Sequence, residues 1–260
     1  MLVCALIFAT LGVASSAAHA TTDIDCGGGS HGAITLSNVS HYTVENCTFT
    51  DVTVQFWLSD HVTLYNDTFT SSGTTKLGCE IYFTGGSYNS VLSSYVDGGG
   101  HDSTLQHGYD DNVCLQNEDH DLVQQNTLTN TWDAGVEWLS TVNDTTVSDN
   151  AFSYNAYTMV GGWHVTPNFN NNAVAANDYS GSLNPSQGLF WVARLSGSGT
   201  SRFDGNTFRD NTAAGSLVVG GDFYTQTNWA EATGNLVCHN GGTAPYAEPA
   251  SGYTISSTCP

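Results

Sequence analysis

The segment Val147-Ser-Asp-Asn-Ala-Phe152 carries the pattern that decides the fold. An apolar residue is followed by a polar stretch containing Asn, and an aromatic residue stands five positions after the first. Clear copies occur at Val44-Glu-Asn-Cys-Thr-Phe49, Leu64-Tyr-Asn-Asp-Thr-Phe69, Val123-Gln-Gln-Asn-Thr-Leu128, Val174-Ala-Ala-Asn-Asp-Tyr179 and Phe203-Asp-Gly-Asn-Thr-Phe208. Looser copies occur at Val91-Leu-Ser-Ser-Tyr-Val96 and Thr233-Gly-Asn-Leu-Val237. The chain therefore repeats one unit along most of its length.

The length of the repeat separates the candidate architectures. Its final apolar positions are 49, 69, 96, 128, 152, 179, 208 and 237, so the intervals are 20, 27, 32, 24, 27, 29 and 29 residues. Helical repeats of this length need amphipathic helices, which the Gly, Asn, Thr and Val content opposes. Short strands separated by polar turns instead predict a parallel β-helix, in which inward side chains stack from rung to rung. Eight rungs at about 4.8 Å give a rod on the order of 40 Å long.

The turns and the segments between them support the same architecture. Asn suits the turns because it tolerates left-handed backbone and its amide can bond the Asn of the next rung. Between the Asn turns lie further apolar segments, which we expect to stack into another parallel sheet. They are Val52–Leu58, Cys79–Phe83, Asn112–Gln116, Gly135–Leu139, Tyr157–Gly161, Gly188–Val192 and Ser216–Val219.

The repeats resemble those of the pectate-lyase-like superfamily over roughly residues 33 to 240. The resemblance implies an all-β fold, a single-stranded right-handed parallel β-helix of about eight rungs with an Asn-rich turn ladder. It does not imply one function, because that superfamily includes lyases, hydrolases, epimerases, phage tailspikes and non-enzymatic surface proteins.

The N-terminal residues predict export. An apolar run from Leu2 to Val13 is followed by small residues ending in Ala18-His-Ala20, the pattern of a signal peptide. The apolar run is too short for a bilayer, which needs about 20 apolar residues. We therefore expect a signal peptide at residues 1–20 and a secreted β-helix domain at 21–260, with a C-terminal cap at 241–260.

Cysteine usage agrees with an exported protein. Six cysteines follow the signal peptide, and an even number favours disulfides, although fifteen pairings exist. None has zinc-ligand spacing. If the fold is a β-helix, Cys79 and Cys114 occupy equivalent strands on successive rungs and should pair. A second bridge, Cys238–Cys259, would pin the C-terminal tail, which leaves Cys26–Cys47 to close the N-terminal end.

The charge balance narrows the range of partners. The chain has 24 acidic residues against Lys76, Arg194, Arg202 and Arg209, for a net charge of −20. Such a charge repels phosphate backbones, so we expect no nucleic-acid partner. No stretch is long and apolar enough to span a membrane. We expect a monomer whose partner is an extracellular polysaccharide.

Titratable residues are concentrated in the longest repeat interval, between positions 96 and 128. Here an insertion, Asp97-Gly-Gly-Gly-His-Asp-Ser-Thr-Leu-Gln-His-Gly-Tyr-Asp-Asp111, leads directly into a predicted strand. Function tends to lie where a solenoid rung grows a loop. The neighbouring carboxylates Asp110 and Asp111 repel each other, so the pKa of one should be raised.

The next two rungs add to this cluster through Trp132-Asp-Ala-Gly-Val-Glu-Trp138 and Gly161-Gly-Trp-His164. In the predicted alignment, Asp110 and Asp111 lie one rung from Asp133 and Glu137 and two rungs from His164. Carboxylates transfer protons and indoles stack on sugars, a composition typical of a glycan site. The catalytic candidates are Asp110, Asp111, Asp133, Glu137, His107, Tyr109 and His164. The candidates for substrate binding are Trp132, Trp138 and Trp163.

Three functions remain open. Inverting glycoside hydrolysis needs two carboxylates about 6.5–9.5 Å apart, which adjacent rungs can supply; the segment 109–116 also resembles the Asp-Asp-Cys strand of β-helical polygalacturonases. Uronate lysis or C5-epimerisation would depend on Ca²⁺ held by Asp110, Asp111 or Asp133, or on His107 and Tyr109. The third function is a non-enzymatic glycan-binding rod. We favour the hydrolase narrowly, because carboxylates are plentiful and basic residues scarce, and it requires no cofactor.

Overall fold

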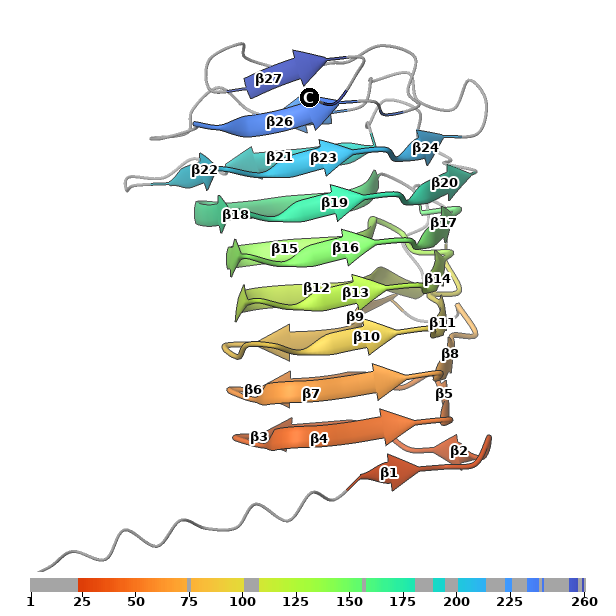
Figure 1. The fold of residues 1–260 in the computed structure, drawn as a ribbon. Coiled ribbons are helices and arrows are strands. Elements are labelled where there is room, and N and C mark those ends of the chain that lie inside the picture. Colours follow the sequence, from red (N-terminus) through yellow and green to blue (C-terminus); the bar gives the residue numbers. More distant parts are fainter. Residues whose placement is uncertain are drawn as a thin grey trace, which may run out of the picture.

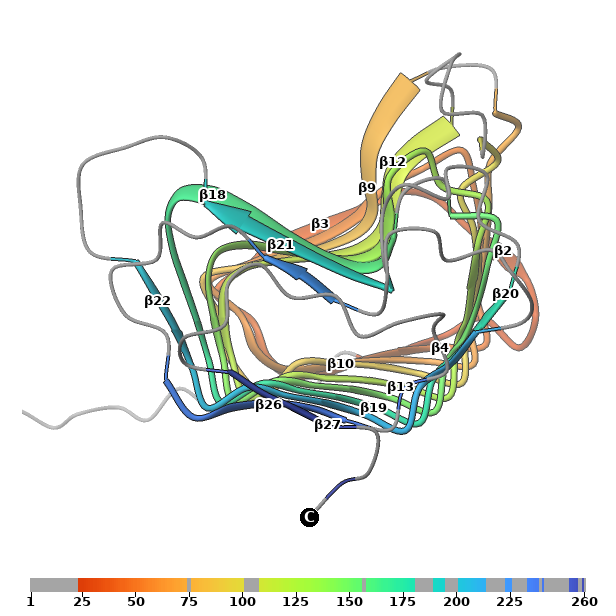
Figure 2. The same ribbon diagram turned by 90° about the horizontal axis from the view of Figure 1, so that it is seen from above.

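The structure is a computed structural model that describes residues 23–73, 76–100, 108–155, 158–180, 189–194, 201–213, 223–225, 233–238, 240, 253–256 and 259. Every regular element in these ranges is a β-strand. The strands stack into a rod (Figure 1), and the view along its axis shows three sheets around a common interior (Figure 2).

Each turn of the chain contributes a strand to each of three parallel sheets. The ten-stranded sheet holds β1 (Ile24–Asp25), β4 (Ser40–Glu45), β7 (Asp60–Tyr65), β10 (Ser90–Leu92), β13 (Leu122–Gln124), β16 (Thr146–Ser148), β19 (Ala173–Ala175), β23 (Thr207–Arg209), β26 (Asn235–Cys238) and β27 (Tyr253–Ser256). The eight-stranded sheet holds β2 (Ser30–His31), β5 (Thr48–Thr50), β8 (Thr68–Thr70), β11 (Tyr95–Asp97), β14 (Thr127–Thr129), β17 (Ala151–Ser153), β20 (Asp178–Ser180) and β24 (Thr212–Ala213).

The nine-stranded sheet contains the segments predicted between the Asn turns. It holds β3 (Ile34–Ser37), β6 (Val54–Trp57), β9 (Lys76–Thr84), β12 (Gly108–Asp119), β15 (Ala134–Asn143), β18 (Thr158–Asn170), β21 (Phe190–Arg194) and β25 (Phe223–Thr225), and β22 (Arg202–Asp204) pairs with β18. The prediction of a further parallel sheet is confirmed for the segments within the described residues. The segment Ser216–Val219 lies outside them.

Apolar side chains stack in register along the interior. Val91 pairs with Val123, which pairs with Val147, and all are fully buried. Phe49 and Phe69 stack with ring centroids 4.7 Å apart. Burial of one apolar position per rung explains why the same residue types recur along the sequence. The predicted parallel β-helix is confirmed.

A ladder of buried Asn side chains marks the corner between the ten-stranded and eight-stranded sheets. The backbone N–H of Asn126 donates to Oδ1 of Asn150 at 2.9 Å, and the N–H of Asn150 donates to Oδ1 of Asn177 at 3.0 Å. The Asn150 amide also donates to the backbone oxygen of Val123 in the preceding rung, at 2.9 Å. These bonds satisfy backbone groups that a buried turn would otherwise leave unpaired. The predicted Asn ladder is therefore confirmed.

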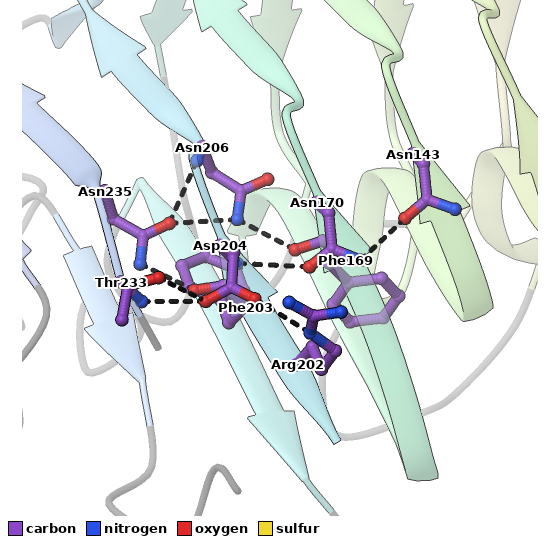
Figure 3. Close-up of polar contacts among 9 residues, drawn as sticks. All are labelled: Asn143, Phe169, Asn170, Arg202, Phe203, Asp204, Asn206, Thr233 and Asn235. Atoms are coloured by element: carbon purple, nitrogen blue, oxygen red, sulfur yellow. Dashed lines mark hydrogen bonds and ion pairs between the residues drawn. The ribbon is translucent and has the colours of Figure 1, made fainter. Parts of the chain in front are cut away.

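A second Asn ladder occupies the corner between the nine-stranded and ten-stranded sheets. The N–H of Asn172 donates to Oδ1 of Asn206 at 3.0 Å, and the N–H of Asn206 donates to Oδ1 of Asn235 at 2.9 Å. The Asn206 amide also donates to the backbone oxygen of Phe169 at 2.8 Å, as Figure 3 shows. Two of the three corners thus use the same device.

The second ladder corrects the predicted equivalence of the repeats. Phe208 pairs with Val174, and Val237 pairs with Phe208, so both lie in the ten-stranded sheet. The earlier final positions, up to Tyr179, lie in the eight-stranded sheet. The alignment was wrong for the last two copies because an apolar residue, an Asn three positions on and another apolar residue occur at both corners, as at Phe169 and Val174.

Carboxyl groups replace amides at two ladder positions. Oδ1 of Asp67 accepts the N–H of Cys47 at 2.8 Å, and Oδ1 of Asp121 accepts the N–H of Asn89 at 2.8 Å. Both side chains are buried. Burial raises the pKa of Asp67 to about 7. Burial, and then the charge of neighbouring Glu118, raise the pKa of Asp121 to about 9. These groups therefore hold protons in the fold at pH values where exposed carboxyls are charged.

Three disulfides join neighbouring rungs, and all three predicted pairings are confirmed. Cys26–Cys47 lies near the first described rung, Cys79–Cys114 joins β9 to β12, and Cys238–Cys259 fixes the C-terminal segment. Within the described residues, no helix has the length and apolar character needed to cross a membrane.

Candidate functional site

The strand order brings the predicted site residues onto neighbouring rungs. β12 pairs with β15, and β15 pairs with β18. Asp110 and Asp111 therefore lie one rung from Asp133 and Glu137, and two rungs from His164, as predicted. In the view along the rod, the first parts of β9 and β12 bend away from the nine-stranded sheet (Figure 2). Asp110 and Asp111 are the third and fourth residues of β12.

Side chains alternate across β15, and this decides what faces outward. Val136 and Trp138 belong to the buried core, so Glu137 between them points to the outer side of the sheet. Its partners in the register are Cys114 on β12 and Gly161 on β18. A Cβ atom at Gly161 would clash with Oε2 of Glu137, so glycine makes room for the carboxyl group.

Asp111 and Glu137 form a buried, electrostatically coupled pair on the outer side of the sheet. Only 7% of Asp111 and 2% of Glu137 is exposed. Burial, and then the charge of Asp111, raise the pKa of Glu137 well above its ordinary value. Burial, and then the charge of Asp133, raise the pKa of Asp111 in the same direction. Burial therefore favours the protonated, neutral form of both carboxyls.

Hydrogen bonding indicates which member of the pair holds the proton. Oδ1 of Asp111 accepts the backbone N–H of Ala134 at 3.0 Å, which favours the charged carboxylate. Oε1 of Glu137 is buried and accepts no hydrogen bond from any described residue. The proton is therefore better placed on Glu137 than on Asp111.

Three further members of the cluster reach the surface. Asp110, Trp132 and Asp133 are half-buried. The N–H of Asp133 donates to the backbone oxygen of Asp110 at 2.7 Å, and the N–H of Trp132 donates to that of Tyr109 at 3.0 Å. These backbone bonds hold the turn before β15 against the first residues of β12. The cluster thus combines two half-buried carboxyls and a half-buried indole with two buried carboxyls.

Two predicted site residues belong to the interior. Trp138 is fully buried and lies 5.7 Å from Phe169 between ring centroids, so it packs in the core and cannot stack on a sugar. Tyr109 is also buried, and its hydroxyl lies 3.5 Å from Oγ1 of Thr53. Burial raises the pKa of Tyr109 to about 12, which makes it a poor base. The expectations for both residues are corrected.

Three predicted residues cannot be placed in the site by their side chains. His107 lies outside the described residues. His164 and Trp163 lie in β18, where His164 pairs with Arg194, and Trp163 pairs with Leu139 and Ala193. Their roles stay predictions.

The calcium site predicted at Asp110, Asp111 and Asp133 does not fit the observed contacts. Among the described residues, a carboxyl oxygen of Asp111 lies within 4.8 Å of the sulfur atoms of Cys79 and Cys114. Asp110, Asp111 and Asp133 form no such group of ligand atoms. Those sulfurs form a disulfide and offer no thiolate to a metal. Calcium takes six to eight oxygen ligands, and a buried carboxyl beside a disulfide contributes few.

The same outer face carries aromatic residues that the sequence interpretation missed. Trp57 on β6 and Tyr82 on β9 meet edge to face, with ring centroids 6.2 Å apart. Trp57 is 45% exposed, and Trp191 on β21, which pairs with Gly161, is half-buried. The signal was in the sequence: Trp57 follows Phe56, and alternation places one of two neighbouring strand residues outside.

A second polar group lies at the opposite edge of this sheet. Asp119, His120 and Asp144 have ligand atoms within 4.8 Å of one another. They adjoin a pocket of about 340 Å³, lined by Asp119, Asn143, Asp144, Asn170, Asn171, Arg202 and Asp204. Figure 3 shows part of its lining, in which Asn170 donates to Asn143 at 2.9 Å and Arg202 pairs with Asp204 at 3.0 Å. Because these side chains bond to one another, we assign the pocket no function.

Three parallel sheets wound around one interior, with ladders of Asn at two corners, define the class of solenoid proteins called parallel β-helices. The family described as "Right handed beta helix region" matches residues 28–228, and the chain belongs to this family. The predicted resemblance to right-handed parallel β-helix repeat proteins is confirmed. No curated protein sequence matches the chain.

Solved structures share this fold at low sequence identity. DFA-IIIase from Arthrobacter chlorophenolicus A6, solved without its lid and in complex with GF2, is 15% identical with a TM-score of 0.57; the match covers 84% of this chain and 52% of that one. The chain thus spans about half the length of that protein. An exopolygalacturonase from Thermotoga maritima is 11% identical with a TM-score of 0.49, covering 83% of this chain and 53% of its own. The likeness to DFA-IIIase shows the fold alone.

Proposed function

We propose that the protein is secreted and binds an extracellular polysaccharide on the outer face of the nine-stranded sheet, where the acidic cluster hydrolyses glycosidic bonds. The observation that carries the proposal is a cluster of carboxyls with different burial, in which the charge of half-buried Asp133 raises the pKa of buried Asp111 and Glu137. Glycoside hydrolysis needs one protonated and one charged carboxyl. Different environments for neighbouring carboxyls are how proteins supply both forms.

The roles follow from exposure and protonation. Asp133 reaches the surface and is the carboxyl that contacts the substrate. Its charge raises the pKa of both buried carboxyls. Glu137 stores the proton, and Asp111, held by the N–H of Ala134, carries the charge. Trp132 beside Asp133 offers an apolar surface to the sugar ring. The fold likeness to DFA-IIIase, solved with bound GF2, supports the proposal only at the level of the fold.

The test is an activity screen of residues 21–260 against neutral and uronate polysaccharides from pH 3 to 8, with and without Ca²⁺. Reducing ends and the ultraviolet absorbance of unsaturated products are measured together. We expect reducing ends without absorbance, and a loss of roughly a hundredfold or more in kcat for Asp133→Asn. Glu137→Gln, which keeps the shape of the side chain, should also lower kcat and move the alkaline limb of the pH profile.

The matched control is Asp149→Asn, which removes an exposed carboxylate at the corner between β16 and β17. Its activity should equal that of the unaltered protein. If ultraviolet absorbance rises together with the reducing ends, the protein is a uronate lyase and not a hydrolase. Full activity in Asp133→Asn would mean that the site lies elsewhere.

One observation favours a second function, a glycan-binding rod without turnover. Glu137 and Asp111 are buried, and a carboxyl must reach the glycosidic oxygen to protonate it. Under this alternative the buried pair is a structural feature of the sheet. Polysaccharide binding without any release of reducing ends, unchanged in Glu137→Gln, is the result that would select it.

A further inference from the structure

The N-terminal half of the same outer face has a composition unlike the acidic cluster. Two rows of residues run across its strands in register. One row is Thr35, Gln55, Tyr82 and Cys114, and it continues to Glu137. The other row is Ser37, Trp57, Thr84 and Gln116. Phe56, Phe83 and Leu115, which alternate with these rows, are buried in the core, so both rows face outward.

The indole of Trp57 is the most prominent feature of these rows. It is 45% exposed, and the adjacent Leu58 is 60% exposed. The ring planes of Trp57 and Tyr82 lie at 75° to each other, so Tyr82 can cover at most one face of the indole. Large apolar groups exposed together mark binding surfaces. An indole with a free face is the group that packs against the apolar side of a sugar ring.

The polar groups near the indole, the hydroxyl of Tyr82 and the amide of Gln116, are uncharged, and a hydrogen bond between them fixes their orientation. The hydroxyl of Tyr82 donates to Oε1 of Gln116, which turns the Nε2 donors of the amide away from Tyr82. Nε2 makes no hydrogen bond to any described residue. Amide and hydroxyl groups of this kind bind sugar hydroxyls, because each can donate or accept.

Charge decides the class of ligand. In the two rows from β3 to β12, no described outward side chain is charged, although the whole chain carries a net charge of −20. A uronate carboxylate would find no cation in these rows and would feel the negative field of the protein. A neutral sugar unit carries no charge, so the negative field does not oppose its binding.

We propose that Trp57, Tyr82 and Gln116, with Gln55 beside them, form a neutral-sugar subsite. The inference rests on the proposed function, because the subsite serves a polysaccharide that also reaches the acidic cluster. β6 and β15 are three strands apart, roughly 14 Å along the rod. The Trp57 row reaches β15 at Leu139, and Asp133 lies six residues earlier, roughly 20 Å along the strand direction. A polysaccharide that runs obliquely across the sheet passes both. The subsite therefore makes a neutral glycan, rather than a polyuronate, the substrate class.

The test measures the affinity of the Asp133→Asn variant, to prevent turnover, for neutral oligosaccharides derived from cellulose, mannan and inulin and for oligogalacturonate of equal length. Isothermal titration calorimetry gives Kd. We expect binding of a neutral oligosaccharide, a roughly tenfold weaker Kd in Trp57→Ala, and near-normal Kd in Trp57→Phe, which keeps an aromatic face. Tyr95→Ala, which removes an exposed ring from the eight-stranded sheet, is the matched control and should bind normally.

The outcomes separate this inference from the proposed function. If Trp57→Ala binds normally while the unaltered protein cleaves a glycan that Asp133→Asn does not, the subsite is wrong and the hydrolase stands. Binding lost in Trp57→Ala, with no cleavage by the unaltered protein, keeps the subsite and selects the binding rod. Tighter binding of oligogalacturonate, or no binding of any neutral probe, overturns the subsite. Circular dichroism confirms that each variant is folded.

Discussion

At the scale of single residues, Glu137 and Trp138 are neighbours with opposite surroundings. Trp138 points into the core, where Gly162 on the next strand faces it. Glu137 points to the outer side, above Gly161. Two consecutive glycines on β18 thus accommodate two large consecutive side chains on β15. The placement of the carboxyl depends on the absence of a single Cβ atom.

Gly161→Ala should lower the free energy of unfolding by about 1–3 kcal/mol, because the new methyl group clashes with the buried carboxyl of Glu137. Urea denaturation followed by tryptophan fluorescence measures the change. Gly78→Ala on β9 is the matched control: a Cβ there meets no atom within 4 Å, so a change within about 0.5 kcal/mol is expected. Equal stability of the two variants would mean that Glu137 can leave its position freely.

At the scale of elements, the corner ladders show how one hydrogen-bonding position accepts two residue types. An Asn ladder residue accepts a backbone N–H with Oδ1 and donates to a backbone oxygen with Nδ2, as Asn150 does. Asp67 accepts the N–H of Cys47 in the same way, but its second oxygen can donate only when protonated. The carboxyl therefore imitates the amide at low pH and fails to do so at high pH.

Asp67→Asn should raise the free energy of unfolding by about 1 kcal/mol at pH 8 and leave it nearly unchanged at pH 4, since the amide donates at every pH. The gain corresponds to about 2–4 °C in Tm. Thermal denaturation at the two pH values measures it. The reverse change, Asn150→Asp, supplies the control: it should destabilise the protein more at pH 8 than at pH 4. A gain from Asp67→Asn that is equal at both pH values would contradict the protonation argument.

The elements also show what the sequence could predict. Apolar and Asn positions recur because every rung buries the same sites, so the fold, the second series of strands and the disulfides were predictable. The last two repeats were not, because Asn172 and Asn177 stand at two corners with the same local spacing. The burial of Glu137 was also not predictable, because strand alternation indicates which face of the sheet a side chain lies on but not how far it is buried. Asp67 occupies the ladder position three residues after Leu64, but its sequence neighbours do not show that its carboxyl is buried.

At the scale of the whole molecule, several buried carboxyls hold protons in the fold. Burial raises the pKa of Asp67 and Glu118 to about 7, of Glu80 to about 8 and of Asp121 to about 9. In the unfolded chain these groups titrate near 4. Between those values the folded state binds more protons than the unfolded state. The contribution of these carboxyls to the free energy of unfolding is therefore fully present at low pH, and it is lost as the pH rises through their pKa values in the folded state.

The free energy of unfolding should fall continuously between about pH 5 and pH 9. Urea denaturation across this range measures it. Repetition at high salt is the control, because salt screens repulsion between exposed charges far more than it affects buried protons. A slope that disappears at high salt would assign the effect to the net charge of −20 instead.

The disulfides acquire a mechanical meaning from the solenoid. Each rung is held by its neighbours alone, so a tensile load on such a rod releases chain from an end, one rung after another. Cys26–Cys47 and Cys238–Cys259, each with a sequence separation of 21, lie near the first and last described rungs, where peeling would begin. While they are closed, force must rupture several rungs together. After reduction of these disulfides, the terminal rungs under load should detach one at a time instead of several together.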